Sequence, residues 1–238
     1  MCGIVGILGQ GEAATRLLAA LERLEYRGYD SAGIAVMNGG PIRRARAEGK
    51  LINLKEKLAD APLSGRSGIG HTRWATHGAP TLKNAHPHVG EGVAIVHNGI
   101  IENYRELKAE LEAVGHVFET ETDTETVAQL IAMHLKAGAP PRQAVRQALD
   151  RIEGAFALAI IIEDAEGLMF GARRGSPLVV GFGDGETFLG SDAIALAGLT
   201  GRVSYLEEGD WVEMRPDGVT IFDAAGDEVD RPIVEVST

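Results

Sequence analysis

The chain has 238 residues, of which 45% are hydrophobic and 24% are charged, and its formal net charge at pH 7 is −11. This is the composition of a soluble globular protein with enough apolar residues for one large domain or two small ones. A nucleic-acid-binding face needs clustered basic residues, whereas residues 207–238 carry ten acidic residues and two arginines. The longest apolar run, at residues 155–162, is too short to span a membrane. We therefore expect no nucleic-acid partner, no membrane span, and an acidic C-terminal stretch that forms a solvated surface.

The first part of the chain is predicted to combine short strands with helices. Residues 4–8 are β-like and leucines at helical spacing follow them, which predicts a strand and then a helix. Each later strand runs into a polar, glycine-containing loop, and these strands are expected at residues 33–37, 67–74 and 93–97. Asn103 and Thr122 each have a glutamate three residues further on, so both are expected to begin helices with capping boxes. A third helix is expected at residues 142–151.

After Gly154 the pattern changes to short β runs separated by turn signals. These runs are at residues 155–162, 168–172, 178–181, 187–190, 203–206, 211–214 and 219–222. Asp-Gly pairs at residues 184–185 and 217–218 suit hairpin turns. Because strict βαβ alternation is absent, we expect an α+β fold with sheets covered by helices. No linker-like segment interrupts the chain, so a single domain over residues 1–238 is expected.

Glycine and histidine patterns offer two further hypotheses. The glycines at residues 3–9 and 181–185 resemble nucleotide-binding loops, but neither set lies between a strand and a helix. We assign them to turns and close packing. Five of the seven histidines fall between His71 and His97, which raises a metal hypothesis. Because the spacing of zinc-ligand motifs is absent, we expect structural histidines and no metal.

The N-terminal residues indicate where the protein is located in the cell and what its single cysteine can do. The first basic residue is Arg16 and no small-residue cleavage site follows an apolar core, so no secretory signal peptide is predicted and a cytoplasmic location is expected. Cys2 is the single cysteine, which excludes an internal disulfide and a cysteine-rich zinc site.

Cys2 follows the initiator methionine directly, and its small side chain predicts removal of Met1. The thiol and a free α-amine would then belong to one residue. The pKa of an α-amine is about 7.7 to 8.0, so much of it is unprotonated close to neutral pH and can accept the thiol proton. This is the N-terminal nucleophile arrangement, in which the chain terminus supplies the base. Position alone leaves the alternative open that Cys2 is a small apolar residue at the start of a buried strand.

Five segments decide between these alternatives. They are Met-Cys-Gly-Ile-Val-Gly at residues 1–6, Glu-Tyr-Arg-Gly-Tyr-Asp-Ser-Ala-Gly at 25–33, His-Thr-Arg-Trp-Ala-Thr-His-Gly at 71–78, His-Asn-Gly-Ile-Ile-Glu-Asn at 97–103 and Glu-Thr-Asp-Thr-Glu at 121–125. In order and spacing they resemble the glutaminase domains of class II glutamine amidotransferases. Within this family they are more similar to glutamine:fructose-6-phosphate amidotransferases than to phosphoribosyl amidotransferases. The resemblance covers essentially the whole chain.

The resemblance implies the four-layer αββα fold of N-terminal nucleophile (Ntn) hydrolases, with two antiparallel sheets between helical layers. It implies hydrolysis of L-glutamine to glutamate and ammonia without a metal or organic cofactor. In the glutamine:fructose-6-phosphate amidotransferases a C-terminal sugar isomerase domain then uses the ammonia to convert fructose 6-phosphate to glucosamine 6-phosphate. The resemblance also leads us to expect a homo-oligomeric full-length enzyme. Because the chain stops at Thr238, before such a domain, we expect a fragment of a longer enzyme or a separate partner chain.

The resemblance also implies roles for individual residues. Cys2 would attack the side-chain amide of glutamine and form a glutamyl thioester, while its own α-amine transfers the proton. Asn98 and Gly99 would form the oxyanion hole. Arg73 would bind the α-carboxylate and Asp123 the α-ammonium group of glutamine. Further residues expected around the substrate are Trp74, Thr76, His77, Arg27 and Gly28.

Several of these residues also have simpler explanations. Asn98 and Gly99 form the dipeptide that most strongly signals a hairpin turn. Arg73 could make a surface ion pair, Trp74 could be a buried aromatic, and Asp123 could simply favour a helix N-terminus. As alternatives for the whole chain, we consider another class II amidotransferase, a non-catalytic glutamine-sensing module if Met1 is retained, and a metal-dependent hydrolase built on the histidines.

Overall fold

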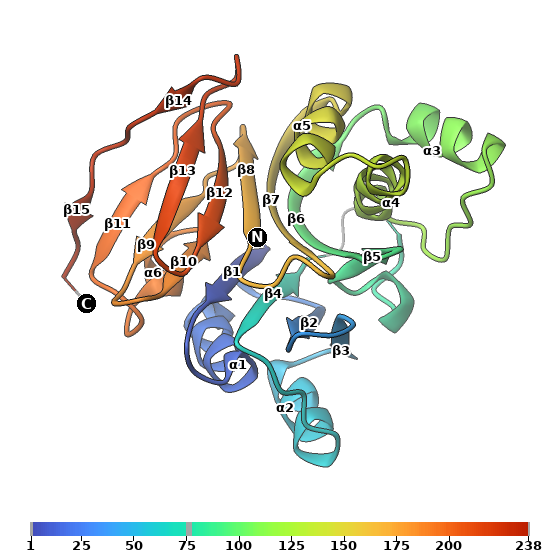
Figure 1. The fold of residues 1–238 in the computed structure, drawn as a ribbon. Coiled ribbons are helices and arrows are strands. Elements are labelled where there is room, and N and C mark those ends of the chain that lie inside the picture. The colour runs from blue at the N-terminus through green and yellow to red at the C-terminus, as the bar shows by residue number, and fades with distance from the viewer. Residues whose placement is uncertain (1, 75–77, 238) are drawn as a thin grey trace.

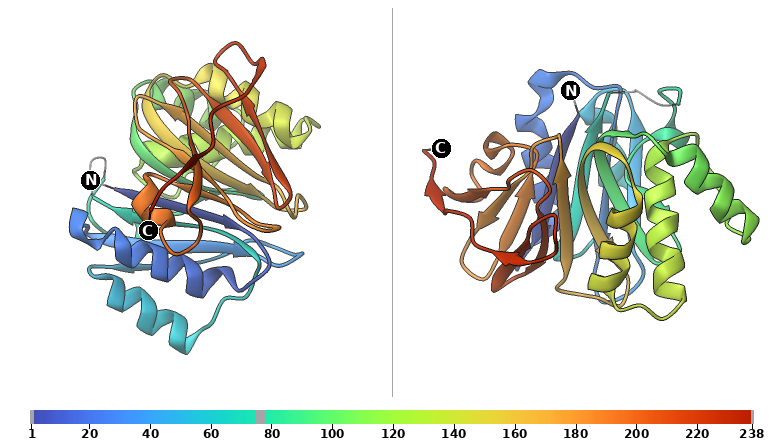
Figure 2. Two further views of the ribbon diagram at one scale, coloured as in Figure 1. Left: turned by 90° about the vertical axis from the view of Figure 1, so that its left-hand side faces the viewer. Right: turned by 90° about the horizontal axis from the view of Figure 1, so that it is seen from above.

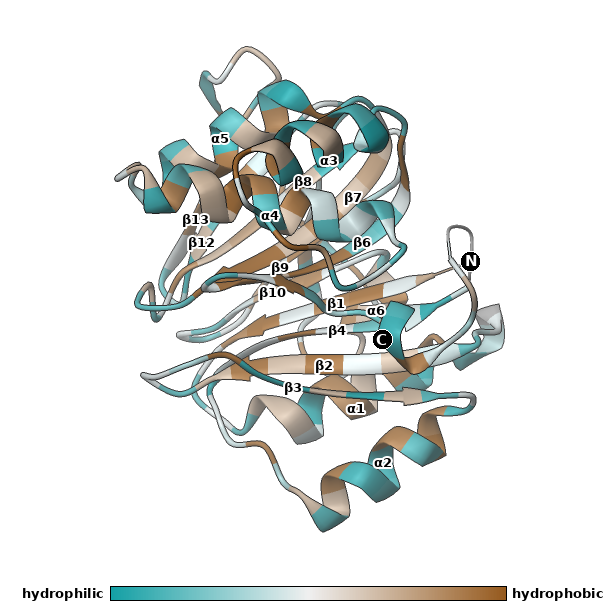
Figure 3. Ribbon diagram, turned by 90° about the vertical axis from the view of Figure 1, so that its right-hand side faces the viewer, coloured by the Kyte–Doolittle hydropathy of each residue, from teal (hydrophilic) through white to brown (hydrophobic). Residues whose placement is uncertain are grey.

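The computed structural model describes residues 2–74 and 78–237, apart from the side chain of Arg27. Two antiparallel sheets are stacked face to face, and helices cover the outer face of each sheet (Figure 3). The layer order is therefore αββα, and the predicted α+β class and four-layer sandwich are confirmed.

The first sheet has eight strands in the order β15-β11-β9-β10-β1-β4-β2-β3. Strand β1 (Gly3–Leu8) lies between β10 (Thr187–Gly190) and β4 (Ser67–Arg73). The remaining strands are β2 (Ser31–Met37), β3 (Arg43–Glu48), β9 (Val179–Phe182), β11 (Arg202–Tyr205) and β15 (Val234–Glu235). Because β1 is an inner strand, Cys2 at its start lies inside the width of the sheet and not at its edge.

The second sheet has seven strands in the order β14-β13-β12-β8-β7-β6-β5. Strand β6 (Val93–Ile101) pairs along its full length with β7 (Gly154–Ile162). The other strands are β5 (His88–Gly90), β8 (Met169–Arg174), β12 (Trp211–Arg215), β13 (Gly218–Phe222) and β14 (Glu228–Val229). The hairpin turns predicted at residues 184–185 and 217–218 are confirmed, since β9 pairs with β10 and β12 with β13.

The helices form the two outer layers (Figures 1 and 2). The first sheet is covered by α1 (Ala13–Arg23), α2 (Leu51–Asp60) and the single turn α6 (Ala193–Leu196). The second is covered by α3 (Tyr104–Ala113), α4 (Asp123–Lys136) and α5 (Pro141–Arg151). Short 3₁₀ turns occupy Glu25–Arg27 and Leu82–Asn84. Within residues 2–74 and 78–237, no helix is long and apolar enough to cross a membrane.

Strand β1 shows why its sequence is apolar throughout. Alternate strand residues face opposite sides of a sheet. Ile4 and Leu8 pack into the core between the two sheets, whereas Val5 and Ile7 pack under the helices. A side chain at Gly6 would meet the Met169 sulfur, which would lie 2.7 Å from an added Cβ. Gly6 therefore serves close packing between the sheets, and an added Cβ at Gly3 would likewise meet a neighbouring side chain, that of Leu24.

Some local predictions were wrong. Strand β3 and helix α2 were not expected, and the strand expected at residues 93–97 continues to Ile101. Neither predicted capping box forms. The Asn103 side chain bridges the Arg151 carbonyl at the end of α5 and the Glu153 amide just after it. The Glu125 carboxylate accepts hydrogen bonds from backbone amides at residues 119 and 120. These side chains have better-placed tertiary partners than the helix ends.

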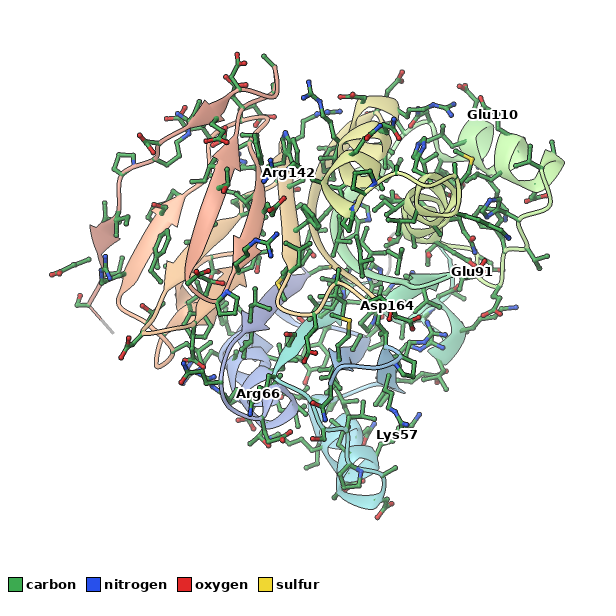
Figure 4. The ribbon with its side chains drawn as sticks, viewed as in Figure 1. Lys57, Arg66, Glu91, Glu110, Arg142 and Asp164 are labelled. Atoms are coloured by element: carbon green, nitrogen blue, oxygen red, sulfur yellow. The ribbon has the colours of Figure 1, made fainter. Side chains whose placement is uncertain are left out.

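The acidic C-terminal stretch is only partly a solvated surface. Glu213 of β12 is buried and accepts two hydrogen bonds from the Arg142 guanidinium, at 2.6 and 3.1 Å, which joins α5 to the second sheet (Figure 4). Asp210 is also buried and makes a bidentate pair with Arg231. Two of the ten acidic residues therefore hold the fold together through paired charges.

Candidate active site

Cys2 lies at the start of β1, next to the last residues of β4. Its sulfur accepts a hydrogen bond from the Trp74 amide at 3.0 Å and lies 3.5 Å from the Trp74 carbonyl oxygen. Burial raises the pKa of the thiol, and the hydrogen bond from the Trp74 backbone opposes this effect only in part. The thiol is therefore protonated near neutral pH, and a base must take its proton before it can attack a substrate.

A cleft opens beside this thiol at the end of the stacked sheets where Figure 3 marks the N-terminus. Its walls come from β1, β4, β6 and the N-terminus of α4, which are far apart in the sequence. The residues lining it are Cys2, Arg73, Trp74, His86, His97, Gly99, Thr122, Asp123 and Thr124. The structure thus brings together five of the residues that the sequence singled out.

Asn98 completes the surroundings of Cys2. Its side-chain Nδ2 donates a hydrogen bond to the Cys2 carbonyl oxygen at 3.0 Å, and its Oδ1 lies 3.1 Å from Nε2 of His71. Asn98 and Gly99 do not form the expected turn, because both pair with β7 as part of the extended strand β6. Gly99 has φ +109°, and an added Cβ would lie 2.1 Å from the Ala155 carbonyl oxygen, so only glycine fits there.

Two opposite charges are fixed in the same cleft. The Arg73 side chain donates hydrogen bonds to the carbonyl oxygens of Ala79 at 3.1 Å and Gly78 at 3.4 Å, and the residue is 3% exposed. Burial lowers the pKa of Arg73, and the nearby Asp30, Cys2 and Asp123 oppose this shift only in part. Asp123 is also 3% exposed and accepts a hydrogen bond from the Ile101 amide at 2.7 Å. The simple alternative for Arg73, a surface ion pair, is wrong because the side chain is buried.

Trp74 and Gly28, two further residues expected around the substrate, lie at the cleft or next to a residue that lines it. The Trp74 side chain is 54% exposed, so it is not a buried aromatic. Gly28 has φ +70°, and a Cβ there would lie 3.3 Å from the Trp74 ring. The backbone of Trp74 thus contacts the nucleophile, while its exposed ring lies against Gly28. Thr76, His77 and the side chain of Arg27 lie outside the residues that the structure describes.

Asn84 is a site residue that the sequence did not reveal. Its Nδ2 donates hydrogen bonds to the Ala79 carbonyl oxygen at 3.0 Å and to the Glu121 carboxylate at 2.9 Å. Its Oδ1 accepts a hydrogen bond from the Glu121 amide at 3.1 Å. Asn84 thus ties the carbonyl group that holds Arg73 to the segment before Asp123. The sequence contains no signal for this role, because Asn84 lies outside the five segments that carry the resemblance and its partners come from distant parts of the chain.

Four of the histidines form a buried cluster at the cleft, and two of them, His86 and His97, line it. The rings of His71 and His86 stack with centroids 4.0 Å apart, and His86 meets His88 edge to face at 4.6 Å. His97 pairs through Nδ1 with the Thr124 hydroxyl at 2.9 Å. Burial lowers the pKa of His71 to about 3 and lowers those of His86 and His88 well below the usual value. These rings are therefore neutral, and in the described part of the chain no three potential metal ligands converge.

These neutral histidines should make the fold sensitive to acid. His71, His86 and His88 stay unprotonated when folded, but each titrates near pH 6.5 in the unfolded chain. Below that pH the unfolded state binds more protons, so the free energy of unfolding falls as the pH is lowered, by up to about 1.4 kcal/mol per pH unit for each histidine. Urea unfolding should give a free energy about 4 to 6 kcal/mol lower at about pH 5 than at about pH 7.5.

A His88→Leu variant is the control for this prediction. Its free energy of unfolding should fall less steeply with decreasing pH than that of the parent chain, because one buried titrating group is absent. A free energy of unfolding that is constant between about pH 7.5 and about pH 5 would contradict the assignment of neutral buried rings.

Comparison with known sequences identifies the family. A family model described as "Glutamine amidotransferase domain" matches residues 71–198. The chain is 60% identical over 238 residues to the glutamine–fructose-6-phosphate aminotransferase (isomerizing) of Gluconobacter oxydans and 59% identical over 233 residues to that of Brucella suis. It spans 39% and 38% of the length of these two relatives.

Solved structures agree on the fold. The glutamine phosphoribosylpyrophosphate amidotransferase of B. subtilis, complexed with ADP and GMP, superposes with a TM-score of 0.79 at 26% identity, covering 95% of this chain and 50% of that one. A glutamine aminotransferase class-II domain protein of Silicibacter pomeroyi superposes with a TM-score of 0.62 at 13% identity and supports the fold alone. The chain belongs to the glutamine amidotransferase domain family and has its Ntn-hydrolase sandwich fold.

Proposed function

We propose that this chain hydrolyses L-glutamine to L-glutamate and ammonia, with Cys2 as the nucleophile. The observation that carries the proposal is the cleft in which the thiol lies beside a buried arginine and a buried aspartate. The head group of glutamine is a zwitterion, so it needs one fixed cation and one fixed anion. Arg73 offers its guanidinium to the α-carboxylate, and Asp123 offers its carboxylate to the α-ammonium.

The chemistry follows from the groups around the thiol. After removal of Met1, the α-amine of Cys2 takes the thiol proton while the sulfur attacks the side-chain amide carbon of glutamine. The resulting oxyanion accepts hydrogen bonds from Nδ2 of Asn98 and the backbone N–H of Gly99. The intermediate collapses with transfer of the proton to the leaving nitrogen, which releases ammonia and leaves a glutamyl thioester. Water then attacks the thioester, releases glutamate and restores the thiol.

The environment of Cys2 supports a role for the α-amine as the base. The raised pKa of the thiol means that little thiolate exists near neutral pH, and burial lowers the pKa values of the stacked rings of His71 and His86. A base belonging to Cys2 itself needs no further side chain in the cleft.

Glutamate release by the chain from L-glutamine tests the proposal directly. Glutamate and ammonia should appear in equal amounts and at the same rate in the presence of a metal chelator. L-Asparagine, which is one methylene shorter, should be a poor substrate because its amide cannot reach the thiol while its head group stays bound. Binding of L-glutamine by calorimetry without any hydrolysis would instead favour the glutamine-sensing module.

The pH dependence of the reaction should report the α-amine. The rate constant kcat/KM should rise about tenfold per pH unit and level off above about pH 8, where the amine is unprotonated. No further change should arise near pH 6.5, because His71, His86 and His88 do not titrate there in the folded protein. Initial rates from about pH 6 to about pH 9 measure this, with recovery of full activity after return to neutral pH as the control for unfolding.

For the longer protein, we propose that the ammonia aminates fructose 6-phosphate to give glucosamine 6-phosphate. Support comes from the names of the relatives, of which this chain spans about two fifths. The proposal includes a C-terminal sugar isomerase domain as the partner, a homo-oligomeric full-length enzyme, a cytoplasmic location, and a single glutaminase domain formed by residues 1–238. Glucosamine 6-phosphate formed from glutamine and fructose 6-phosphate by the chain plus that domain, but not by the chain alone, would test it.

A further inference from the structure

We propose that His71 is a positioning residue that fixes the orientation of the Asn98 side-chain amide, so that its NH₂ group and not its oxygen faces the reacting centre. The proposal rests on the proposed function, because it assigns to Asn98 the role of oxyanion donor. Neither the charge of His71 nor direct contact with substrate is involved.

The two residues meet between the sheets. In β4, His71 lies two residues after Ile69, so these two side chains share one face of the first sheet. In β6, Asn98 lies two residues after Val96, so these two share one face of the second sheet. Ile69 and Val96 both belong to the core between the two sheets. His71 is completely buried in this layer, and its ring stacks on that of His86, which lines the cleft. Strand alternation therefore aims both side chains at the same place.

The hydrogen bonds assign the proton on the His71 ring. Nε2 lies 2.9 Å from the carbonyl oxygen of His97 and 3.1 Å from Oδ1 of Asn98. A carbonyl oxygen only accepts hydrogen bonds, so Nε2 must carry the proton. Nδ1 of His71 is buried and has no hydrogen-bond partner within the described structure, as suits the unprotonated nitrogen of a neutral ring. Burial also lowers the pKa of His71 to about 3, so this form persists at neutral pH.

The ring proton in turn assigns the two ends of the Asn98 amide. The atom facing Nε2–H must be the amide oxygen, and the NH₂ group then faces the Cys2 carbonyl oxygen at 3.0 Å. Both contacts favour the same orientation. A flipped amide would place NH₂ against a donor and oxygen against an acceptor, which loses two hydrogen bonds at once. One hydrogen of NH₂ binds Cys2, and the other remains to bind an oxyanion.

A pair of substitutions that differ by one methylene group tests this role. Glutamine at position 71 extends its amide nitrogen to about the place of Nε2, whereas asparagine ends near the place of Nδ1 and cannot reach Asn98. His71→Asn is expected to lower kcat for glutamate release about 10- to 100-fold with KM changed less than about threefold, since an oxyanion donor acts mainly in the transition state. His71→Gln should keep most of the kcat of the parent chain.

The same substitutions in the Asn98→Ala chain separate positioning from a structural effect. If His71 acts through Asn98, adding His71→Asn to Asn98→Ala should change kcat less than about twofold. His88→Asn is the control, because it also removes a buried ring of the cluster without contacting Asn98. It should lower the free energy of unfolding but leave kcat within about threefold of the parent value.

Three outcomes would overturn the inference. His71→Asn and His71→Gln could lower kcat equally, or His71→Asn could lower the kcat of the Asn98→Ala chain as much as that of the parent chain. The third is a loss of kcat in His88→Asn as large as that in His71→Asn. If the asparagine variant does not fold, failure of His71→Gln to keep kcat while it binds L-glutamine normally overturns it as well. A failure of the proposed function looks different. The parent chain would then release no glutamate, or Asn98→Ala would keep full kcat.

Discussion

Replacement of Cys2 with alanine is expected to abolish glutamate release, with a fall in kcat of at least about 10³-fold. Among the described residues that line the cleft, Cys2 carries the only thiol, and the hydroxyls of Thr122 and Thr124 are already hydrogen-bonded to Thr120 and His97. Arg73 is held as a cation, Asp123 accepts a hydrogen bond from the Ile101 amide, and the neighbouring histidine rings are buried in a stack. Without the sulfur, water would have to attack an unactivated amide. Steady-state assays of purified parent and variant chains measure the effect.

The Cys2→Ala chain should still bind L-glutamine, which makes binding its internal control. Calorimetry should give a Kd within a few fold of the KM of the parent chain, because Arg73 and Asp123 remain. An intact-mass measurement on both preparations shows whether Met1 is absent, so that a loss of activity is not confused with a blocked α-amine. Hydrolysis by the alanine variant at the rate of the parent chain would rule out the thioester mechanism.

Much of the fold could be predicted because its strands and helices carry strong periodic signals. The helices α3 to α5 and the strands β7 to β13 match their predicted positions to within a few residues, whereas the short strands β14 and β15 were not predicted. Strand β3 escaped prediction because three arginines dominate its sequence and only small alanines, Ala45 and Ala47, point inward. These alanines pack in the core cluster that includes the leucines of α2, a tertiary contact that no local pattern records.

The candidate site shows the same limit at the level of single residues. The Asn-Gly pair at residues 98–99 favours a turn locally, yet pairing with β7 extends the strand through it. The positive φ of Gly99 is used inside a strand, where the Ala155 carbonyl leaves no room for a side chain. Tertiary pairing thus overrides a local preference that is worth little energy.

The supporting residues could not be predicted, because their roles depend on contacts between distant segments. Asn84 acts through Glu121, and His71 acts through Asn98. The spacing of the histidines predicts a structural role, but the sequence does not show which ring nitrogen meets which acceptor. Residue types predict the chemistry at the nucleophile, and only the packing of the two sheets reveals what orients it.

Removal of either charge from the substrate cleft is expected to weaken glutamine binding strongly. Arg73→Ala and Asp123→Ala should each raise KM about 10²- to 10³-fold with a smaller effect on kcat, because truncating one partner of a buried charge pair costs about 3 to 4 kcal/mol. Both side chains are 3% exposed, so water cannot replace the missing partner. Arg73→Lys should fall between the parent and Arg73→Ala, since lysine keeps the charge but loses the paired donors.

A substrate analogue shows whether Asp123 binds the α-ammonium group. Glutaramate, the analogue of glutamine that lacks only the α-amino group, should be hydrolysed by the parent chain with a kcat/KM about 10²-fold or more below that for glutamine. In the Asp123→Ala chain this preference should fall below about tenfold, because the anion that recognises the ammonium is gone. Arg73→Ala is the matched control and should keep the preference, since it affects both substrates through their shared carboxylate. An unchanged preference in the Asp123→Ala chain would show that the ammonium is bound elsewhere in the cleft.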